Sequence, residues 1–311
     1  MIPTNKKMLI TGGAGFQGSH LVEHFLDLGY DVTTLNTFSE RSEKNISYLK
    51  KKPKIVWGSV TDPEIVNKTV REHDIILHLA AYINVDESIK DPGFTFRANI
   101  EGTYNVLEAV RKNKNRLIYT STCEVYGAPV GKRLIDEITE LRPHSPYSAS
   151  KAAADRLSFS YFKTYGLDIS IIRPFNIFGP RQREDEFGAL IPISVKRALE
   201  GKNLQIFGNG QQTRDYMYID DVVQAYDLMV RLENTAGEVY NFGTGTETSV
   251  KEIVEYIAKK FGVGVEHIEA RPGEVTNFCA DITKVKALGF EPKVNIWEGI
   301  DKYISWRSNF R

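Results

Sequence analysis

Three reactive side chains follow one another in this chain: the hydroxyl of Thr122, the thiol of Cys123 and the carboxylate of Glu124. They come directly after the apolar run RLIYTS at 116–121, where we expect a buried strand to end. A carboxylate is costly to bury without a purpose, so Glu124 is predicted to have a functional role. Cys123 is either a proton donor or a small buried filler.

A second pair follows in SPYSASK, where Tyr147 and Lys151 stand four residues apart at the start of an expected helix. This spacing puts both side chains on one helical face. A lysine ammonium lowers the pKa of a neighbouring tyrosine and favours a phenolate. The pair therefore predicts a general base that works near neutral pH.

A glycine-rich turn follows the first expected strand, with Gly12, Gly15 and Gly18 in the segment TGGAGFQGSH. Glycines between a strand and a helix let the backbone approach a pyrophosphate, and the helix N-terminus offers unpaired N–H groups. This position favours a dinucleotide site over glycines that serve only a tight turn.

The second expected strand ends at Asn36, where dinucleotide-binding proteins that use NAD carry an acidic residue. Asparagine bonds a ribose hydroxyl without repelling a 2′-phosphate. Ser39 and Arg41 follow within reach of such a phosphate, although Arg41 is equally well explained as a solvated loop charge. Both NAD and NADP stay open.

The elements that must position these residues alternate along the first half of the chain. Short aliphatic runs predict buried parallel strands at 8–11, 31–35, 54–57, 74–80, 116–121 and 168–174. Amphipathic patterns predict helices between them, most clearly at 17–28, 62–71, 94–113 and 147–165. Strict alternation predicts an α/β fold, a doubly wound parallel sheet of the Rossmann type.

After about residue 180 the pattern loosens into helices with short strands at 204–207 and 238–243, which predicts a smaller substrate-binding lobe. We expect a dinucleotide-binding domain at 1–180 with a returning segment near 214–243. The second lobe is expected at 181–213 and 244–311.

The composition excludes several classes of protein. Hydrophobic residues make up 41% and charged residues 26%, as in ordinary folded proteins. Forty basic and forty acidic residues cancel, so neither nucleic acid nor a membrane surface is expected as a partner. Two cysteines without metal-type spacing predict no metal site and no disulfide framework, and no stretch has the length of a membrane span. We expect a cytoplasmic protein.

Together these motifs resemble the extended short-chain dehydrogenase/reductase family of nucleotide-sugar epimerases, dehydratases and decarboxylases. The similarity covers nearly the whole chain. Beyond TGGAGFQG, Thr122 and YSASK, it includes HLAA at 78–81, NIEGT at 99–103, RPFNIFGPRQ at 173–182, GNGQQTRDYMYIDDV at 208–222, NFGTG at 241–245 and RPGEVTNFCAD at 271–281.

The resemblance implies site residues, a cofactor and a partner. The residues implied to hold NAD or NADP, tightly bound and recycled, are Gly12, Gly15, Phe16, Gln17, Gly18, Asn36, Ser39, Arg41, Ser59, Val60, Leu79, Ala80, Ala81, Asn99, Tyr147 and Lys151. Those implied to face a nucleotide sugar are Tyr82, Asn84, Asn176, Arg181, Leu190, Gln205, Arg214, Arg271 and Glu274. A homodimer through the helices near 94–113 and 147–165 is implied as well.

Some of these residues have a plainer interpretation. Ser59 stands where the family more often has an aspartate against the adenine amine. Tyr82 and Asn84 either line the sugar pocket or only cap the next helix. His78, in an apolar strand, is expected to be a core histidine with satisfied hydrogen bonds rather than a catalyst.

The triplet TCE distinguishes between activities within the family. An epimerase needs only the hydroxyl, the tyrosine and the lysine, whereas related dehydratases use a glutamate here to remove the carbon 5 proton of a 4-ketosugar. An aspartate before it protonates the leaving 6-hydroxyl, and here Cys123 stands in its place. TCE resembles the 5,6-dehydratases that act on UDP-N-acetylglucosamine more closely than the TDE of 4,6-dehydratases.

The sequence therefore predicts an NAD(P)-dependent nucleotide-sugar dehydratase, with Thr122, Cys123, Glu124, Tyr147 and Lys151 as catalytic residues. Whether the hydride returns to carbon 4 or to carbon 6 stays open. The alternatives are a UDP-sugar 4-epimerase in which Glu124 is a bystander, and a non-catalytic NAD(P)-binding sensor that signals by dimerising.

Overall fold

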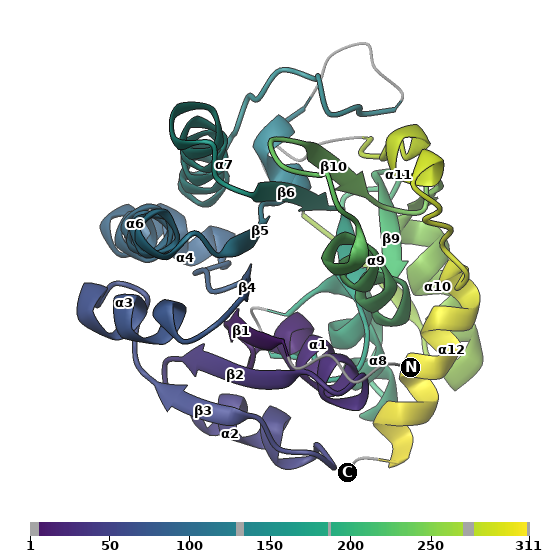
Figure 1. Cartoon of the computed structure of the whole chain (residues 1–311). Helices are drawn as coiled ribbons and strands as arrows, with labels where there is room; N and C mark the ends of the chain where they lie inside the picture. Colours follow the sequence, from purple (N-terminus) through teal and green to yellow (C-terminus); the bar gives the residue numbers. More distant parts are fainter. Residues whose placement is uncertain (1–5, 129–133, 186–187, 270–276, 310–311) are drawn as a thin grey trace. The chain divides into compact units, whose positions relative to one another are not determined.

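The computed structural model describes residues 6–128, 134–185, 188–269 and 277–309. Among these residues, strands and helices alternate through the first half of the chain, as predicted (Figure 1). The strands of the main sheet are β1 (Lys7–Thr11), β2 (Asp31–Asn36), β3 (Lys54–Trp57), β4 (Ile75–His78), β5 (Arg116–Thr120), β6 (Ile169–Pro174) and β10 (Val239–Phe242). The helices that accompany them are α1 (Phe16–Asp27), α2 (Glu40–Ser47), α3 (Pro63–Arg71), α4 (Val85–Lys90), α5 (Pro92–Phe96), α6 (Gly102–Asn113), α7 (Pro146–Tyr165) and α9 (Ile219–Arg231).

The main sheet has the strand order β10-β6-β5-β4-β1-β2-β3, and the pairs from β3 to β6 run parallel. The chain winds outward from β1 through β2 to β3, then crosses to β4 on the other side of β1. The prediction of a doubly wound parallel sheet is confirmed. In such sheets ligands bind at the carboxyl ends of the strands where the winding direction changes, which here lies between β1 and β4.

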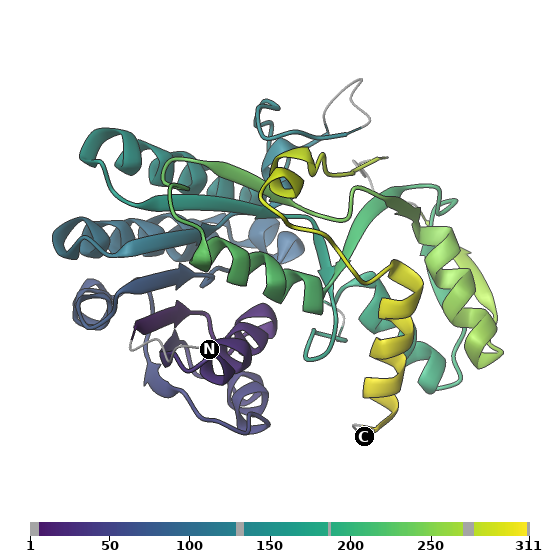
Figure 2. The same cartoon turned by 45° about the vertical axis from the view of Figure 1, so that its right-hand side comes forward.

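Helices cover both faces of this sheet. Figures 1 and 2 show α3, α6 and α7 together on one face and α1 and α9 on the other. Leu9, Ile76, Leu107 and Leu117 belong to the buried cluster under α3, α6 and α7. Because β1, β4 and β5 are buried, their sequences are apolar without alternation. No helix in the described ranges has the length and apolar character needed to cross a membrane.

Local signals explain where the long helix α7 begins and ends. Ser145 and Ser148 form a reciprocal capping box, and Pro146 occupies the first helical position, where no N–H is needed. The helix ends at Gly166, whose φ of 64° lies in the left-handed region that glycine adopts at little cost. These caps fix the start of the helix, which carries Tyr147 and Lys151.

The helix predicted over 94–113 is present, but it is not α-helical throughout. It consists of α5, a π-helical turn η1 (Arg97–Glu101) and α6. Asn99 in this turn is fully buried and bonded to the loop after β4 and to α7. Wide turns of this kind occur often at functional sites, and periodicity alone does not reveal them because the apolar pattern continues through the turn.

By its internal contacts the chain divides into two compact units. Unit 1 comprises Met1–Gly127, Leu141–Arg173 and Val223–Tyr240, and unit 2 comprises Ala128–Glu140, Pro174–Val222 and Asn241–Arg311. The remaining elements are η2, a 3-10 helix at Cys123–Tyr126, then β7 (Asn176–Phe178), α8 (Leu190–Leu199), β8 (Leu204–Phe207), β9 (Thr213–Tyr218), β11 (Glu247–Ser249), α10 (Val250–Phe261), β12 (Val265–Ile268), α11 (Thr283–Ala287) and α12 (Ile296–Asn309). Within unit 2 the strands form a three-stranded sheet, β11-β9-β7, and a two-stranded sheet, β12-β8.

Candidate active site

The glycine-rich turn between β1 and α1 is shaped to accept a pyrophosphate. Gly12 has a φ of 72°, and a Cβ there would lie 2.9 Å from the Ala80 backbone nitrogen. A Cβ on Gly18 would lie 2.2 Å from the Gly12 carbonyl oxygen. Gly15 is exposed at the start of α1, and no side chain caps the helix there. The positive end of α1 is therefore open to an anion, and the residues present fit a dinucleotide.

Two asparagines hold this turn in place. The Asn36 Oδ1 accepts a hydrogen bond from the Ala14 N–H at 2.7 Å, and its Nδ2 donates to the Thr34 hydroxyl at 2.8 Å. From α2, Asn45 donates to the Ala14 carbonyl at 3.0 Å. Asn36 thus supports the glycine turn directly. The sequence analysis did not identify Asn45, which is buried although it belongs to a mainly polar helix.

The other residues expected near the adenosine half lie at the carboxyl ends of β2 and β3. Ser39 caps α2 by accepting from the Ser42 N–H at 3.1 Å, and Arg41 lies in the first turn of that helix. The Ser59 hydroxyl accepts from the Thr61 N–H at 3.1 Å. Val60 is buried, and a Cβ on Gly102 would meet its methyl group at 2.6 Å.

His78, at the end of β4, has the structural role that was expected of it. Its two ring nitrogens share hydrogen bonds with the Thr11 hydroxyl at 2.7 Å and the Thr103 hydroxyl at 3.1 Å. Burial, with a smaller contribution from the charge of Lys151, lowers the pKa of His78 to about 3. The Thr11 hydroxyl also accepts from the Ala80 N–H at 3.2 Å, so the histidine supports the strand ends on both sides of the glycine turn.

Leu79, Ala80 and Ala81 follow β4 and are half-buried beside that turn. After them, Asn99 binds Tyr82 through both backbone groups, accepting from its N–H at 2.7 Å and donating to its carbonyl at 2.9 Å. Asn84 caps α4 by accepting from the Glu87 N–H at 2.9 Å. The capping interpretation of Asn84 is thereby confirmed, and a role in a sugar pocket stays a prediction.

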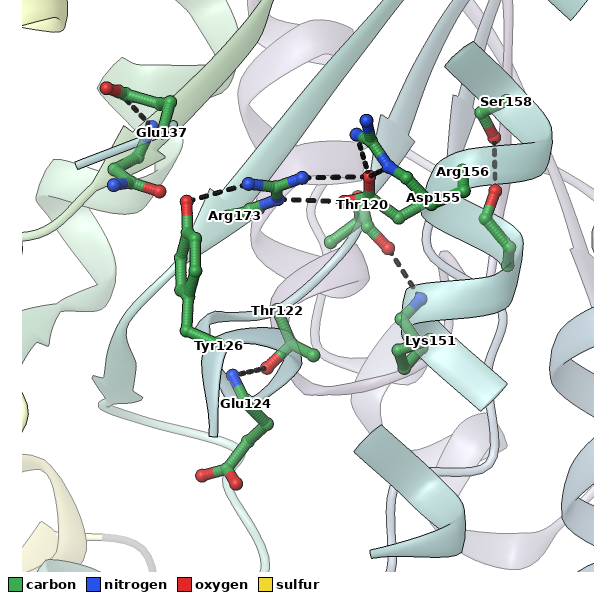
Figure 3. Close-up of polar contacts among 12 residues, drawn as sticks. Thr120, Thr122, Glu124, Tyr126, Glu137, Lys151, Asp155, Arg156, Ser158 and Arg173 are labelled. Atoms are coloured by element: carbon green, nitrogen blue, oxygen red, sulfur yellow. Dashed lines mark hydrogen bonds and ion pairs between the residues drawn. The ribbon is translucent and has the colours of Figure 1, made fainter. Parts of the chain in front are cut away.

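Tyr147 and Lys151 lie in the first two turns of α7 and are both buried. The Tyr147 N–H donates to the Ser88 hydroxyl at 3.1 Å, which ties the helix start to α4. The Lys151 ammonium donates to the Thr120 carbonyl at 2.6 Å (Figure 3). It also lies 4.6 Å from the centre of the Tyr119 ring. Lysine and tyrosine are thus both held at the carboxyl end of β5.

Burial dominates the electrostatics of this pair. It lowers the pKa of Lys151 to about 7, against the opposing charge of Asp155. It raises the pKa of Tyr147 far above the ordinary value, although a hydrogen bond with Thr122 acts in the opposite direction. The lowered tyrosine pKa that the spacing predicted is therefore not found in this structure, because burial outweighs the hydrogen bond. The ammonium is itself bonded to a backbone carbonyl.

The turn η2 brings the reactive triplet to this pair. Thr122 precedes the turn, and its hydroxyl accepts from the Glu124 N–H at 3.3 Å (Figure 3). Cys123 is buried, whereas Glu124 is half-buried. Thr122 is also hydrogen-bonded to Tyr147, and the charges of Glu124 and Cys123 act to raise the pKa of that phenol. Within unit 1, the structure thus gathers all five residues predicted to be catalytic.

Apart from Tyr82 and Asn84, which belong to unit 1, the residues expected to face the nucleotide sugar belong to unit 2. Asn176 pairs with Tyr216 across β7 and β9, and Arg214 lies two positions before Tyr216, so Asn176 and Arg214 occupy one face of this sheet. The Asn176 Oδ1 is buried without a hydrogen-bond partner in the described part of the chain. Such an orphaned acceptor is suited to a donor group on a ligand.

The remaining substrate candidates are more dispersed. Arg181 follows β7 with a left-handed φ of 68°, and Leu190 begins α8. Gln205 lies on β8, where it donates to Glu266 at 2.8 Å. Arg271 and Glu274 lie outside the described residues.

Sequence reasoning missed a carboxylate that organises the loop beside Arg214. Asp215 is fully buried and accepts from the Thr244 N–H at 2.8 Å, the Gly245 N–H at 2.9 Å and the Ala280 N–H at 3.2 Å. Burial raises its pKa despite these bonds. The signal in the sequence was an aspartate in the middle of the strand segment TRDYMY.

Known proteins resemble this chain along most of its length. A family model described as GDP-mannose 4,6 dehydratase matches residues 9–303. A putative UDP-glucose 4-epimerase from Methanocaldococcus jannaschii is 34% identical over 97% of this chain and 98% of its own length. A dTDP-glucose 4,6-dehydratase from Streptomyces niveus is also 34% identical, over 96% of this chain and 92% of its own length.

Among solved structures, the dTDP-glucose 4,6-dehydratase DesIV from Streptomyces venezuelae, with NAD and TYD bound, superposes with a TM-score of 0.91. It is 30% identical and covers 98% of each chain. The resemblance that the motifs predicted is therefore confirmed along nearly the whole chain. Since epimerases and dehydratases match equally well, the reaction must be argued from the site.

Proposed function

We propose that this chain, which belongs to the GDP-mannose 4,6 dehydratase family, removes water from a nucleotide sugar. The proposed reaction oxidises carbon 4, removes the carbon 5 proton and expels the 6-hydroxyl as water. UDP-N-acetylglucosamine or a similar nucleotide hexose is the proposed substrate, because TCE resembles the triplet of enzymes that act on it.

One observation carries this proposal: the Thr122 hydroxyl that accepts from the N–H of Glu124, a half-buried carboxylate, is also hydrogen-bonded to Tyr147. Oxidation and reduction at carbon 4 require a base at one oxygen atom, and Tyr147 supplies it. A second base beside the first has a purpose when a proton must leave a neighbouring carbon, as in elimination.

Each residue then has one task. Tyr147, hydrogen-bonded to Thr122, takes the proton of the 4-hydroxyl, and a protonated Lys151 one turn along α7 would stabilise the phenolate that forms. Glu124 takes the carbon 5 proton, which the adjacent ketone makes acidic. Cys123, or a water that it holds, gives a proton to the departing 6-hydroxyl, so the net change is the loss of one water.

Bound at the glycine turn, NAD or NADP would accept a hydride from carbon 4 and return it to the sugar after water has left. The structure of DesIV with NAD supports NAD. Asn36 is uncharged and leaves room for a 2′-phosphate, so NADP remains part of the proposal. In unit 2, Asn176 and Arg214 would bind the nucleotide and its diphosphate, since arginine forms paired hydrogen bonds with phosphate oxygens.

The test is the variant Glu124→Gln with UDP-N-acetylglucosamine in deuterated water. In the unchanged protein we expect a product lighter by one water. Removing the base should slow water loss by about 10²- to 10⁴-fold, the usual contribution of a positioned base. Glu255→Gln, an exposed glutamate on α10, is the matched control and should leave the rate unchanged.

A second candidate, a UDP-sugar 4-epimerase, is favoured by the Methanocaldococcus jannaschii relative. The same experiment separates the two reactions. A product of unchanged mass with inverted carbon 4, formed equally fast by Glu124→Gln, would replace the dehydratase proposal with the epimerase.

We also propose that the protein is a homodimer. Phe96 on α5, Tyr104 on α6 and Tyr165 on α7 are each more than two-fifths exposed. Exposed aromatic side chains on neighbouring helices are typical of an interface between protein chains.

A further inference from the structure

A buried ion pair lies behind the catalytic residues of unit 1. Asp155 follows Lys151 by one helical turn on α7, and Arg173 projects from β6. Arg173 binds both carboxylate oxygens of Asp155, through Nε at 2.9 Å and Nη2 at 2.9 Å, and both side chains are almost completely buried (Figure 3). Arg156, which is partly exposed, also donates to Asp155 from its Nε at 3.0 Å.

The same arginine reaches the turn that carries Glu124. Its Nη1 donates to the Tyr126 hydroxyl at 2.8 Å, and the guanidinium carbon lies 4.9 Å from the centre of the Tyr126 ring. Tyr126 is the last residue of η2 and is fully buried. One guanidinium therefore joins the helix of Lys151 to the turn of Glu124 (Figure 3).

Stability alone does not account for this arrangement. The free energy needed to remove two charges from water is nearly as large as the free energy gained from their attraction. Well-packed apolar side chains in the same place often give a core the same stability. A bidentate pair with a third partner instead fixes distances and angles among the elements that it joins. Asp155 also has an electrostatic effect, because its charge raises the pKa of Lys151 against the lowering by burial.

We infer that Asp155, Arg173 and Tyr126 are positioning residues, which hold the turn of Glu124 at a fixed place relative to the helix of Lys151. The inference rests on the proposed function, in which Glu124 removes the carbon 5 proton. Tyr147 and Lys151 lie on the helix itself, so they keep their places when the bond to the turn is lost. Loosening η2 should therefore impair proton removal from carbon 5 more than oxidation at carbon 4.

The test is Tyr126→Phe, which removes the hydroxyl that accepts from Arg173 and keeps the ring. We expect kcat to fall about tenfold while KM stays within about twofold, as for a group that acts in the transition state. Primary isotope effects identify the affected step. The kinetic isotope effect of deuterium at carbon 5 on kcat should rise, because proton removal there becomes the slower step. The kinetic isotope effect of deuterium at carbon 4 should fall towards unity.

A second readout needs no turnover. Amide hydrogen exchange in the segment 121–128 should become faster in Tyr126→Phe, and exchange in α7 should not change. Tyr161→Phe is the matched control. It removes the hydroxyl of another buried tyrosine, which lies in the C-terminal half of α7 and donates to Glu108 on α6. Arg173→Lys, which keeps the charge but not the two-pronged geometry, should reproduce the isotope pattern of Tyr126→Phe.

The possible outcomes are distinct. Equal losses in both steps, together with a lower thermal midpoint, would show a merely structural role and overturn the inference. Unchanged exchange in 121–128 would overturn it as well. If Glu124→Gln still loses water at the full rate, the proposed function fails instead, and the exchange measurement alone then decides whether Tyr126 and Arg173 fix the turn.

Discussion

The neutral, buried state of His78 predicts how the stability of this protein depends on pH. In an unfolded chain a histidine has a pKa of about 6.5, whereas burial lowers the pKa of His78 to about 3 in the folded protein. Between these values the unfolded chain binds a proton that the folded chain does not. The free energy of unfolding therefore falls as the pH is lowered through this range.

The size of the effect follows from the two pKa values. The full difference of 3.5 between 6.5 and 3 corresponds to about 5 kcal/mol. Only part of it is lost over an accessible range: between about pH 7.5 and pH 5 the loss is roughly 2 kcal/mol. Since other groups titrate as well, the quantity to measure is the difference between the unchanged protein and His78→Gln.

On going from pH 7.5 to pH 5, the unchanged protein should lose about 2 kcal/mol more of its unfolding free energy than His78→Gln does. Glutamine keeps a donor and an acceptor for Thr11 and Thr103 but does not titrate. Urea unfolding followed by circular dichroism gives the values. The exposed His267, replaced by glutamine, is the matched control. A difference that stays constant over this range would refute the assignment of His78 as a buried neutral group.

Two further predictions concern the cofactor turn and unit 2. Asn36→Asp keeps the acceptor for the Ala14 N–H but adds a negative charge that repels a 2′-phosphate. In fluorescence titrations the affinity for NADP should therefore fall at least tenfold relative to that for NAD. An equal change in the two affinities would show that this position does not distinguish the two cofactors. Asp215→Asn replaces one carboxylate oxygen with an NH₂ group, which then faces the backbone N–H groups of Thr244 and Gly245 without an acceptor between them. The free energy of unfolding, measured by urea titration, should therefore drop by about 2 kcal/mol. An unchanged midpoint would show that this carboxylate does not hold the loop.

The sheet could be predicted from the sequence because its signals are local. Aliphatic runs, helix caps and the turn glycines each lie within a few residues of the element that they define. The strand expected at 74–80 ends earlier, at His78, and the Leu79 N–H makes one more bond to β1, at the Thr11 carbonyl. The π-helical turn at Arg97–Glu101 carries Asn99, whose partners Tyr82 and Ser150 are distant in the sequence, so the local pattern does not reveal it.

The candidate site could also be predicted from the sequence only in part. The spacing of Tyr147 and Lys151 predicted their common face, but not the bond from Lys151 to Thr120, which lies 31 residues away. Arg173 and Asp155 were missed because their contact requires β6 to lie under α7. One signal was present, since an arginine within the apolar strand segment ISIIRP needs a buried carboxylate, and the sequence does not say which one.

The division of unit 1 into three stretches of chain has a consequence for biosynthesis. A ribosome that has made only the residues up to Arg173 has produced β6 without β10, whose neighbouring Glu238 carbonyl later accepts from the Ile171 N–H. Tyr226, which shares a hydrogen bond with the Thr120 hydroxyl beside the lysine, is also still missing. The nascent protein thus carries an open strand edge while the next fifty or so residues emerge, as Pro174–Val222 lie between. Truncated products that end in this interval should aggregate through that edge, which β10 later covers.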